Sequence, residues 1–278
     1  MQVLDCPPNL PKMHIDAIGG CSGDLNRTLN ADATLQGNAG DFDEVGPGMQ
    51  VEVWSDVVCP WCYIGKRRLE SALAQFPHRD QVEVVWRSFQ LDPSVPEGET
   101  HATLPALAAK YGASVEDMRA NMARVEQLAA DEGLEYHLAD GVSGNTLLAH
   151  ELLHLAAEHG KRNELKERLL HAYFEEGRPV FDVDSLVPFA VEIGLDEAEV
   201  REALADRRYL SAVRQDGATA QALGATGVPF FVVDRKYGAA GAQPAELLLQ
   251  ILERAWAEAN PLVTVPAAEG CEDDTCAV

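Results

Sequence analysis

The apolar and polar residues of the segment that starts at Met49 alternate, which is the pattern of a half-buried β-strand. This alternation covers residues 49–55, MQVEVWS. Apolar residues at helical spacing follow from about Cys59 to Gln75, and residues 81–91, QVEVVWRSFQL, return to β-branched and aromatic side chains. The first ordered unit of the chain is therefore predicted to be β-α-β.

Residues 100–224 carry almost continuous helical spacing of their apolar side chains. Ser114 and Asp117 resemble a capping box at the start of one helix, and Ser143 is expected to open the next. Glycines are expected to close successive helices; they are Gly133, Gly160, Gly177 and Gly194. We therefore predict that this region is almost wholly helical.

Strand character returns in residues 227–234, GVPFFVVD, and more weakly in residues 236–240. A final helix is expected from Pro244, because proline suits the first turn of a helix. The predicted order is thus β-α-β, then a helical insertion, then α-β-β-α. The sequence shows no internal repeat.

The two ends of the chain differ from this ordered part. Residues 1–48 are rich in Gly, Asn and Asp and show no sustained apolar period, so we expect a flexible extension there. Residues 261–278 form a polar, acidic tail with a C-x4-C pair, Cys271 and Cys276. The folded part is therefore expected to span residues 49–260.

The composition is that of a soluble globular protein, with 46% hydrophobic and 24% charged residues. No apolar run is long enough to span a membrane, and the N-terminus lacks the basic and apolar regions of a secretory signal. We therefore expect a cytoplasmic protein. The formal net charge of −23 argues against nucleic-acid partners, whose phosphates need a basic face, and against anionic membrane surfaces.

The six cysteines fall into three pairs, which is too few for a disulfide scaffold in a chain of 278 residues. Cys6 and Cys21 lie in the N-terminal extension, and the tail holds another pair. Cys59 and Cys62 stand where the first strand gives way to the first helix. In a reducing compartment, closely spaced cysteines more often indicate catalysis or metal binding than structural bridges.

A cysteine at the start of a helix faces free N–H groups and the positive end of the helix dipole. We therefore expect the pKa of the Cys59 thiol to fall below its ordinary value. Cys62 lies one turn further on and could close a disulfide with Cys59, while Pro60 suits the first turn. Two alternatives stay open: both thiols fill the core, or they form half of a zinc site. A second cysteine pair at the usual spacing of a zinc site is missing.

The dipeptide Val228-Pro229 opens a hydrophobic strand, where proline is tolerated at the first position or at a sheet edge. A bulky residue before proline could support a cis peptide bond. An ordinary trans proline at the start of a strand is the alternative.

Two motifs together resemble the DsbA-like thioredoxin superfamily, and most closely its FrnE-like branch, also labelled 2-hydroxychromene-2-carboxylate isomerase/DsbA-like. They are SDVVCPWCYIGKRRLE, residues 55–70, and TGVPFFVVDRKYGAAGAQPAELLLQIL, residues 226–252. The resemblance covers residues 49–260 and implies an α/β protein with a thioredoxin-like fold and an inserted all-helical domain. It assigns residues 49–99 and 211–260 to the thioredoxin-like domain and residues 100–210 to the insertion.

The resemblance also implies the roles of the site residues. Cys59 would be the nucleophile, Cys62 the resolving thiol, and Pro229 a cis-proline that faces them. Pro60, Trp61 and Val228, which are sequence neighbours of these three residues, would position the substrate. The dipeptide between the cysteines lacks the histidine that is typical of secreted DsbA proteins.

The function expected from this resemblance is a cytoplasmic thiol-disulfide oxidoreductase or protein disulfide isomerase. Its partners would be protein clients with thiols or disulfides, and glutathione or a thioredoxin-type reductant would regenerate it without a metal or organic cofactor. The alternative is glutathione-dependent isomerisation of a small aromatic or polyketide-like substrate. Relatives with that chemistry commonly keep a single serine or cysteine at the first position, so the presence of both Cys59 and Cys62 favours redox exchange.

A second motif competes with this interpretation. HELLH, His150–His154, matches the His-Glu-x-x-His pattern of zinc hydrolases, in which Glu151 would be the base. The extended form of that pattern fails, because Ala157 stands where glycine is required. The simpler interpretation is an amphipathic helix whose Leu152 and Leu155 pack inward.

Two further sites stay open. The tail pair, Cys271 and Cys276, is interpreted as an auxiliary redox pair, a site for a soft metal cation, or two incidental thiols. Asp56, three residues before Cys59, is either a proton carrier or, more simply, a solvated loop residue or the N-cap of the active-site helix.

Overall fold

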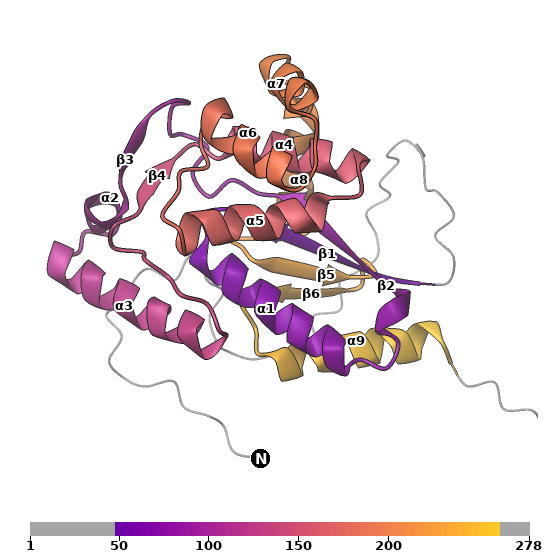
Figure 1. Ribbon diagram of the computed structural model, residues 1–278. Helices are drawn as coiled ribbons and strands as arrows, with labels where there is room; N and C mark the ends of the chain where they lie inside the picture. The colour runs from indigo at the N-terminus through magenta and orange to yellow at the C-terminus, as the bar shows by residue number, and fades with distance from the viewer. Residues whose placement is uncertain (1–47, 262–278) are drawn as a thin grey trace, which may run out of the picture.

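The computed structural model describes residues 48–261. A four-stranded sheet in the order β2-β1-β5-β6 forms its centre (Figure 1). The strands are β1 (Met49–Ser55), β2 (Val82–Ser88), β5 (Phe230–Val233) and β6 (Tyr237–Ala240). β1 runs parallel to β2, because the helix α1 (Pro60–Gln75) carries the chain back between them, whereas β5 and β6 are antiparallel to their neighbours.

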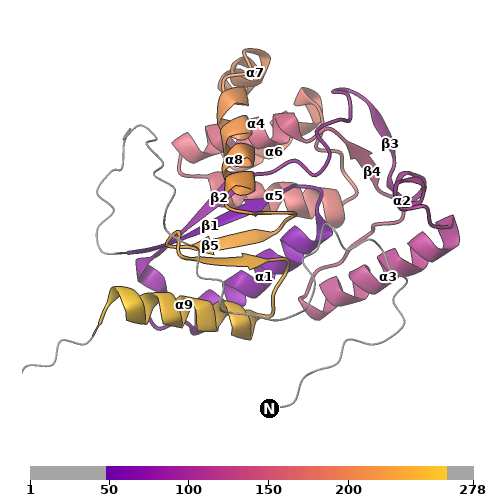
Figure 2. The same ribbon diagram turned by 180° about the vertical axis from the view of Figure 1, so that it is seen from behind.

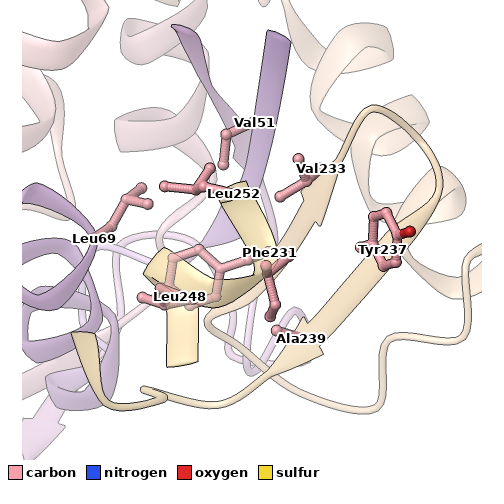
Figure 3. A pocket seen from close by; sticks show the side chains of 9 residues that line it. Val51, Leu69, Phe231, Val233, Tyr237, Ala239, Leu248 and Leu252 are labelled. Atoms are coloured by element: carbon pink, nitrogen blue, oxygen red, sulfur yellow. The ribbon is translucent and has the colours of Figure 1, made fainter. Parts of the chain in front are cut away.

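Helices cover both faces of this sheet. α1 and α9 (Ala245–Ala259) lie on one face, as both views show (Figures 1 and 2). The other face is covered by α4 (Leu147–Glu158), α5 (Arg162–Phe174) and α8 (Leu210–Ala222). The residues between α1, α9 and the sheet form one apolar core, in which Val51, Leu69 and Leu252 are buried. A small apolar cavity between α9 and the sheet (Figure 3) has the same lining. It is a packing defect of this core rather than a separate site.

Seven α-helices follow between β2 and β5 in the described part of the chain. They are α2 (Thr103–Tyr111), α3 (Val115–Asp131), α4 (Leu147–Glu158), α5 (Arg162–Phe174), α6 (Val183–Glu192), α7 (Glu197–Ala205) and α8 (Leu210–Ala222). Ser114 caps α3 by accepting the Asp117 N–H at 3.0 Å, as its sequence predicted. A single 3₁₀ turn, Arg79–Gln81, precedes β2.

The prediction that this region is almost wholly helical is wrong at two places. β3 (Thr100–Ala102) and β4 (Val142–Gly144) pair as a short antiparallel ribbon. Ser143 therefore lies in a strand, and the next helix begins four residues later at Leu147. The two strands are short and meet across forty residues, so only the tertiary structure brings their backbone groups together.

The helical insertion and the central sheet share cores. Val57, which follows β1, is fully buried in a cluster formed by α4, α5, α6 and α7. Tyr63 and Ile64 of α1 are buried against Leu170 and Phe174 of α5. The start of α1 is thus enclosed by side chains from the insertion, and this enclosure sets the environment of the candidate site.

Candidate active site

Cys59 and Cys62 lie together at the start of α1. Cys59 is the N-cap residue, Pro60 is the first residue of the helix, and the Cys62 N–H donates to the Cys59 carbonyl at 3.0 Å. Both thiols are free and buried, with 3% of Cys59 and 1% of Cys62 exposed. The Cys59 S–H donates to the Val228 carbonyl oxygen at 3.5 Å, and the two sulfurs lie near enough for each to shift the pKa of the other.

The turn before β5 lies against Cys59. The Val228-Pro229 peptide bond is cis, which confirms the cis arrangement that the family resemblance implies. The Val228 carbonyl oxygen lies 3.5 Å from the Cys59 sulfur. Residues 169 positions apart in the sequence therefore meet at the reactive pair.

Gly65 allows this close approach. A Cβ atom at Gly65 would lie 2.9 Å from Pro229 Cγ and 3.2 Å from Phe231 Cζ, which is closer than carbon atoms normally come. The contact between α1 and the Pro229 turn therefore requires a glycine at this position, in the second turn of the helix.

The two thiols differ in their ionisation. The hydrogen bond to Cys62, together with burial, raises the pKa of the Cys59 thiol well above its ordinary value. The pKa of Cys62 is lowered: burial opposes this, but the hydrogen bond from Cys59, the charge of Lys166 and a hydrogen bond from Ser55 outweigh it. The expectation that Cys59 carries the lowered pKa is corrected on this point. The two thiols titrate as a coupled pair, in which the Cys59 S–H donates to the Val228 carbonyl oxygen.

Asp56 is buried rather than solvated, and it is not the N-cap of α1, so the two simpler interpretations of this residue are wrong. Its carboxylate accepts the backbone N–H groups of Val57 at 2.7 Å and Leu91 at 2.8 Å. The imidazole of His150 lies 3.1 Å from the same carboxylate. Burial raises the pKa of Asp56, but the partners, His150 first, hold it below its ordinary value. Asp56 thus stays ionised and ties the loop after β1 to α4.

Lys166 of α5 is the functional candidate that the sequence interpretation missed. Its side chain is 1% exposed, and its ammonium lies 3.5 Å from the Ser55 carbonyl oxygen at the end of β1. Burial lowers its pKa to about 8, against the charges of Cys62 and Asp56, which raise it. A signal was present, because Lys166 shares the apolar stripe of α5 with Leu169 and Leu170 at helical spacing.

The aromatic residues of the insertion also reach the cysteine pair. The Tyr136 hydroxyl donates to the Pro60 carbonyl at 2.8 Å, and the Tyr136 ring stacks on Phe174. Trp61, between the two cysteines, is partly buried against the same cluster. The segment between the sulfurs is therefore fixed from the side of the insertion.

The HELLH motif divides among three different partners. His150 contacts Asp56, Glu151 lies 3.1 Å from Arg207 Nε, and His154 lies 3.1 Å from Asp216. Leu152 and Leu155 are fully buried, as the amphipathic interpretation predicted. Within residues 48–261, no three His, Cys, Asp or Glu side chains are arranged to hold a metal ion. The side chains of this motif therefore serve separate ion pairs.

The remaining predicted residues lie elsewhere. Cys6, Cys21, Cys271 and Cys276 fall outside the described residues. Within the described part of the chain, none of the helices combines the length and the apolar character that crossing a bilayer requires.

Comparison with known proteins identifies the chain by family. The model of the DSBA-like thioredoxin domain family matches residues 50–253. A probable DsbA oxidoreductase from Streptomyces coelicolor has 50% sequence identity and a TM-score of 0.74, with 83% of this chain and 99% of that chain covered. The uncharacterized protein YwbO of Bacillus subtilis is 32% identical over 188 residues, which are 66% of this chain and 86% of YwbO.

Two solved structures of lower identity share the fold. The 2-hydroxychromene-2-carboxylate isomerase has 15% identity and a TM-score of 0.56, with 75% of this chain and 97% of that chain covered. The cytosolic disulfide reductase DsbM from Pseudomonas aeruginosa, solved with GSH, has 18% identity and a TM-score of 0.53, with 74% of this chain and 98% of that chain covered.

Proposed function

Because the chain belongs to the DSBA-like thioredoxin domain family, we propose that it is a thiol-disulfide oxidoreductase that exchanges disulfides with protein clients through Cys59 and Cys62. The family match and the structure give a thioredoxin-like fold with a helical portion, as the sequence predicted. The observation that supports the proposal best is the pair of free, buried thiols at the start of α1, with the Cys59 S–H donating to the Val228 carbonyl oxygen.

The first step of the reducing direction forms a mixed disulfide. The Cys59 sulfur, whose S–H donates to the Val228 carbonyl oxygen in the resting pair, gives its proton to the neighbouring Cys62 thiolate. Cys59 then attacks one sulfur of the client disulfide. A bond forms between Cys59 and the client as the client disulfide breaks, and the other client sulfur leaves with the electron pair and takes up a proton from water. Val228 and Pro229, with Pro60 and Trp61, would position the extended client backbone beside the reacting sulfur.

The second step releases the client. Cys62 loses its proton and attacks the Cys59 sulfur, so that the Cys59–Cys62 disulfide forms and the bond to the client breaks. The client sulfur leaves as a thiolate and is protonated. The client has gained two electrons and the cysteine pair has lost them, so a reductant must restore the pair. Glutathione or a thioredoxin-type dithiol is the proposed reductant, the cytoplasm is the proposed compartment, and the cycle requires no metal or organic cofactor.

Insulin reduction and the refolding of scrambled ribonuclease test this function. Cys59→Ser should abolish both, because no other described sulfur lies at the start of a helix beside the Val228 turn. Cys62→Ser should accumulate a mixed disulfide between Cys59 and the client, which mass spectrometry detects. Full turnover by Cys59→Ser would contradict the proposal.

Isomerisation of a small substrate with glutathione remains the second candidate, because the fold is shared with 2-hydroxychromene-2-carboxylate isomerase. The two functions differ in their need for Cys62. Redox exchange requires a resolving thiol, whereas an isomerase with bound glutathione does not. Turnover of a small aromatic substrate at an unchanged rate in Cys62→Ser, together with no insulin reduction by the wild type, would favour the isomerase.

A further inference from the structure

We propose that Lys166, which the helical insertion contributes, is a positioning residue for the resolving thiol. Its side chain supplies the buried positive charge beside Cys62 and so stabilises the thiolate that attacks the mixed disulfide. This inference rests on the proposed function and names the group that makes its second step possible.

The burial of Lys166 is the first argument. Only 1% of the residue is exposed, and a buried ammonium is costly unless a negative group compensates for it. Its only hydrogen bond in the described part of the chain is a long one, 3.5 Å, to the Ser55 carbonyl oxygen. It forms no ion pair with a carboxylate there. The Cys62 sulfur is the negative group that acts on it most strongly.

Position is the second argument. Lys166 reaches the end of β1, and Ser55 at that end also donates a hydrogen bond to the Cys62 sulfur. Cys62 and Lys166 are thus held by the same residue from two sides. The ammonium also lies 5.9 Å from the centre of the Trp86 ring.

The charges around Lys166 fit a group that stabilises a thiolate at Cys62. Burial lowers its pKa, as does the charge of Lys66, while the sulfurs of Cys62 and Cys59 and the carboxylate of Asp56 raise it. The pKa is about 8, so the side chain is mostly an ammonium at neutral pH.

The step is balanced in atoms and charge. The Cys62 sulfur loses its proton to water, and the Lys166 ammonium, which stays protonated, stabilises the thiolate. The Cys62 thiolate then attacks the Cys59 sulfur, and the client thiolate departs with the electron pair and takes up a proton from water. When the pair is reduced again, Cys62 also takes up a proton from water.

Lys66 is a matched control for this role. It lies in α1, one turn after Cys62, and is also buried. Its ammonium pairs with Glu70 and lies 2.6 Å from Glu167, so its charge is already neutralised. Lys66→Met and Lys166→Met remove the same group from two buried positions near the same cysteine, but only the second removes an unneutralised charge.

The first experiment measures the thiolate absorbance of Cys62 against pH in a Cys59→Ser background, where no second active-site thiol interferes. Lys166→Met should raise the pKa of Cys62 by at least about one unit, which lowers the thiolate fraction at neutral pH about tenfold. Lys66→Met should change that fraction by less than about threefold. An equal pKa of Cys62 with and without the Lys166 side chain would overturn the proposal.

The second experiment uses the wild-type chain, so it does not depend on the folding of a variant. The ammonium of Lys166 is titrated by NMR in the reduced and in the oxidised protein. Because oxidation removes the thiolate that raises the pKa of Lys166, the oxidised protein should show the lower value. The same pKa in both forms would refute the inference. Neither titration requires client turnover, so a failure of the proposed function would appear in the insulin assay alone.

Discussion

At the scale of single residues, ionisable groups that are buried in this protein either have partners or have a shifted pKa. Asp56 keeps its charge because three N–H groups surround it. Lys166 has no such set of partners, and its pKa falls to about 8. Buried charge is expensive, so an unpaired buried group is the residue whose protonation the rest of the site controls.

Glu151 provides a prediction on this point. Burial raises the pKa of its carboxyl above the ordinary 4.5, although Arg207 opposes the shift. A raised carboxyl pKa gives a contribution to stability that is complete below the ordinary value and is lost as the pH rises through the folded-state value. Glu151→Gln removes this loss. The unfolding free energy, measured in urea, should therefore decrease between about pH 4 and pH 7 more in the wild type than in Glu151→Gln. The two decreases should differ by on the order of 1 kcal/mol.

The activity of Glu151→Gln separates the two readings of the HELLH motif. Insulin reduction should stay within about twofold of the wild type, which is less than 0.5 kcal/mol in rate, because Arg207 keeps its two hydrogen bonds to Glu97 at 2.7 and 2.8 Å. Loss of a zinc-dependent activity in this variant would instead support the metal interpretation.

At the scale of secondary-structure elements, the active site is a junction between the start of α1 and the turn before β5. Gly65 permits their contact, because a Cβ atom would lie 2.9 Å from Pro229. Gly65→Ala should destabilise the protein by about 1–3 kcal/mol and displace the turn from Cys59. Insulin reduction should decrease about tenfold, since small displacements at a reacting centre have large effects on rate.

Gly217→Ala is the matched control. Gly217 lies inside α8, and an added Cβ would have no atom within 4 Å. Alanine there should stabilise the protein by about 0.5–1 kcal/mol and leave insulin reduction unchanged. Equal changes in melting temperature for the two variants would show that the contact with Pro229 does not require glycine at position 65.

The elements also show how far the sequence predicted the structure. Periodicity and residue type predicted β1, α1, β5 and α9, although β1 and β5 are buried on both faces rather than on one. The β3–β4 ribbon was missed, because its two strands pair across forty residues and carry no pattern of their own. Cys59 and Cys62 were predicted from their local motif. Lys166 was not, because its role depends on a contact between residues 111 positions apart in the sequence.

At the scale of the whole molecule, the insertion and the central sheet are one packed body around Val57 and the start of α1. We therefore expect a single cooperative unfolding transition. The chain supplies separate probes for its two parts. All four tryptophans belong to the sheet, α1 or α9; they are Trp54, Trp61, Trp86 and Trp256. Most of the helices belong to the insertion.

Tryptophan fluorescence and far-UV circular dichroism should consequently give the same midpoint in a denaturant titration. A helical signal that is lost separately from the fluorescence signal would mean that the insertion unfolds by itself. Tyr136→Phe tests the link between the parts. Loss of its hydrogen bond to Pro60 should lower the free energy of unfolding by about 1 kcal/mol, so that both signals shift to the same lower midpoint and the transition stays single.

The location of Lys166 in α5 has a consequence for how such chains are compared and engineered. A chimera that combined the CPWC segment of this protein with the helices of another would preserve every residue of the recognised motif. It would nevertheless exchange the group that faces the second sulfur. Two proteins with the same four letters at this position can therefore differ in oxidising strength, and the difference should follow the borrowed helix rather than the motif.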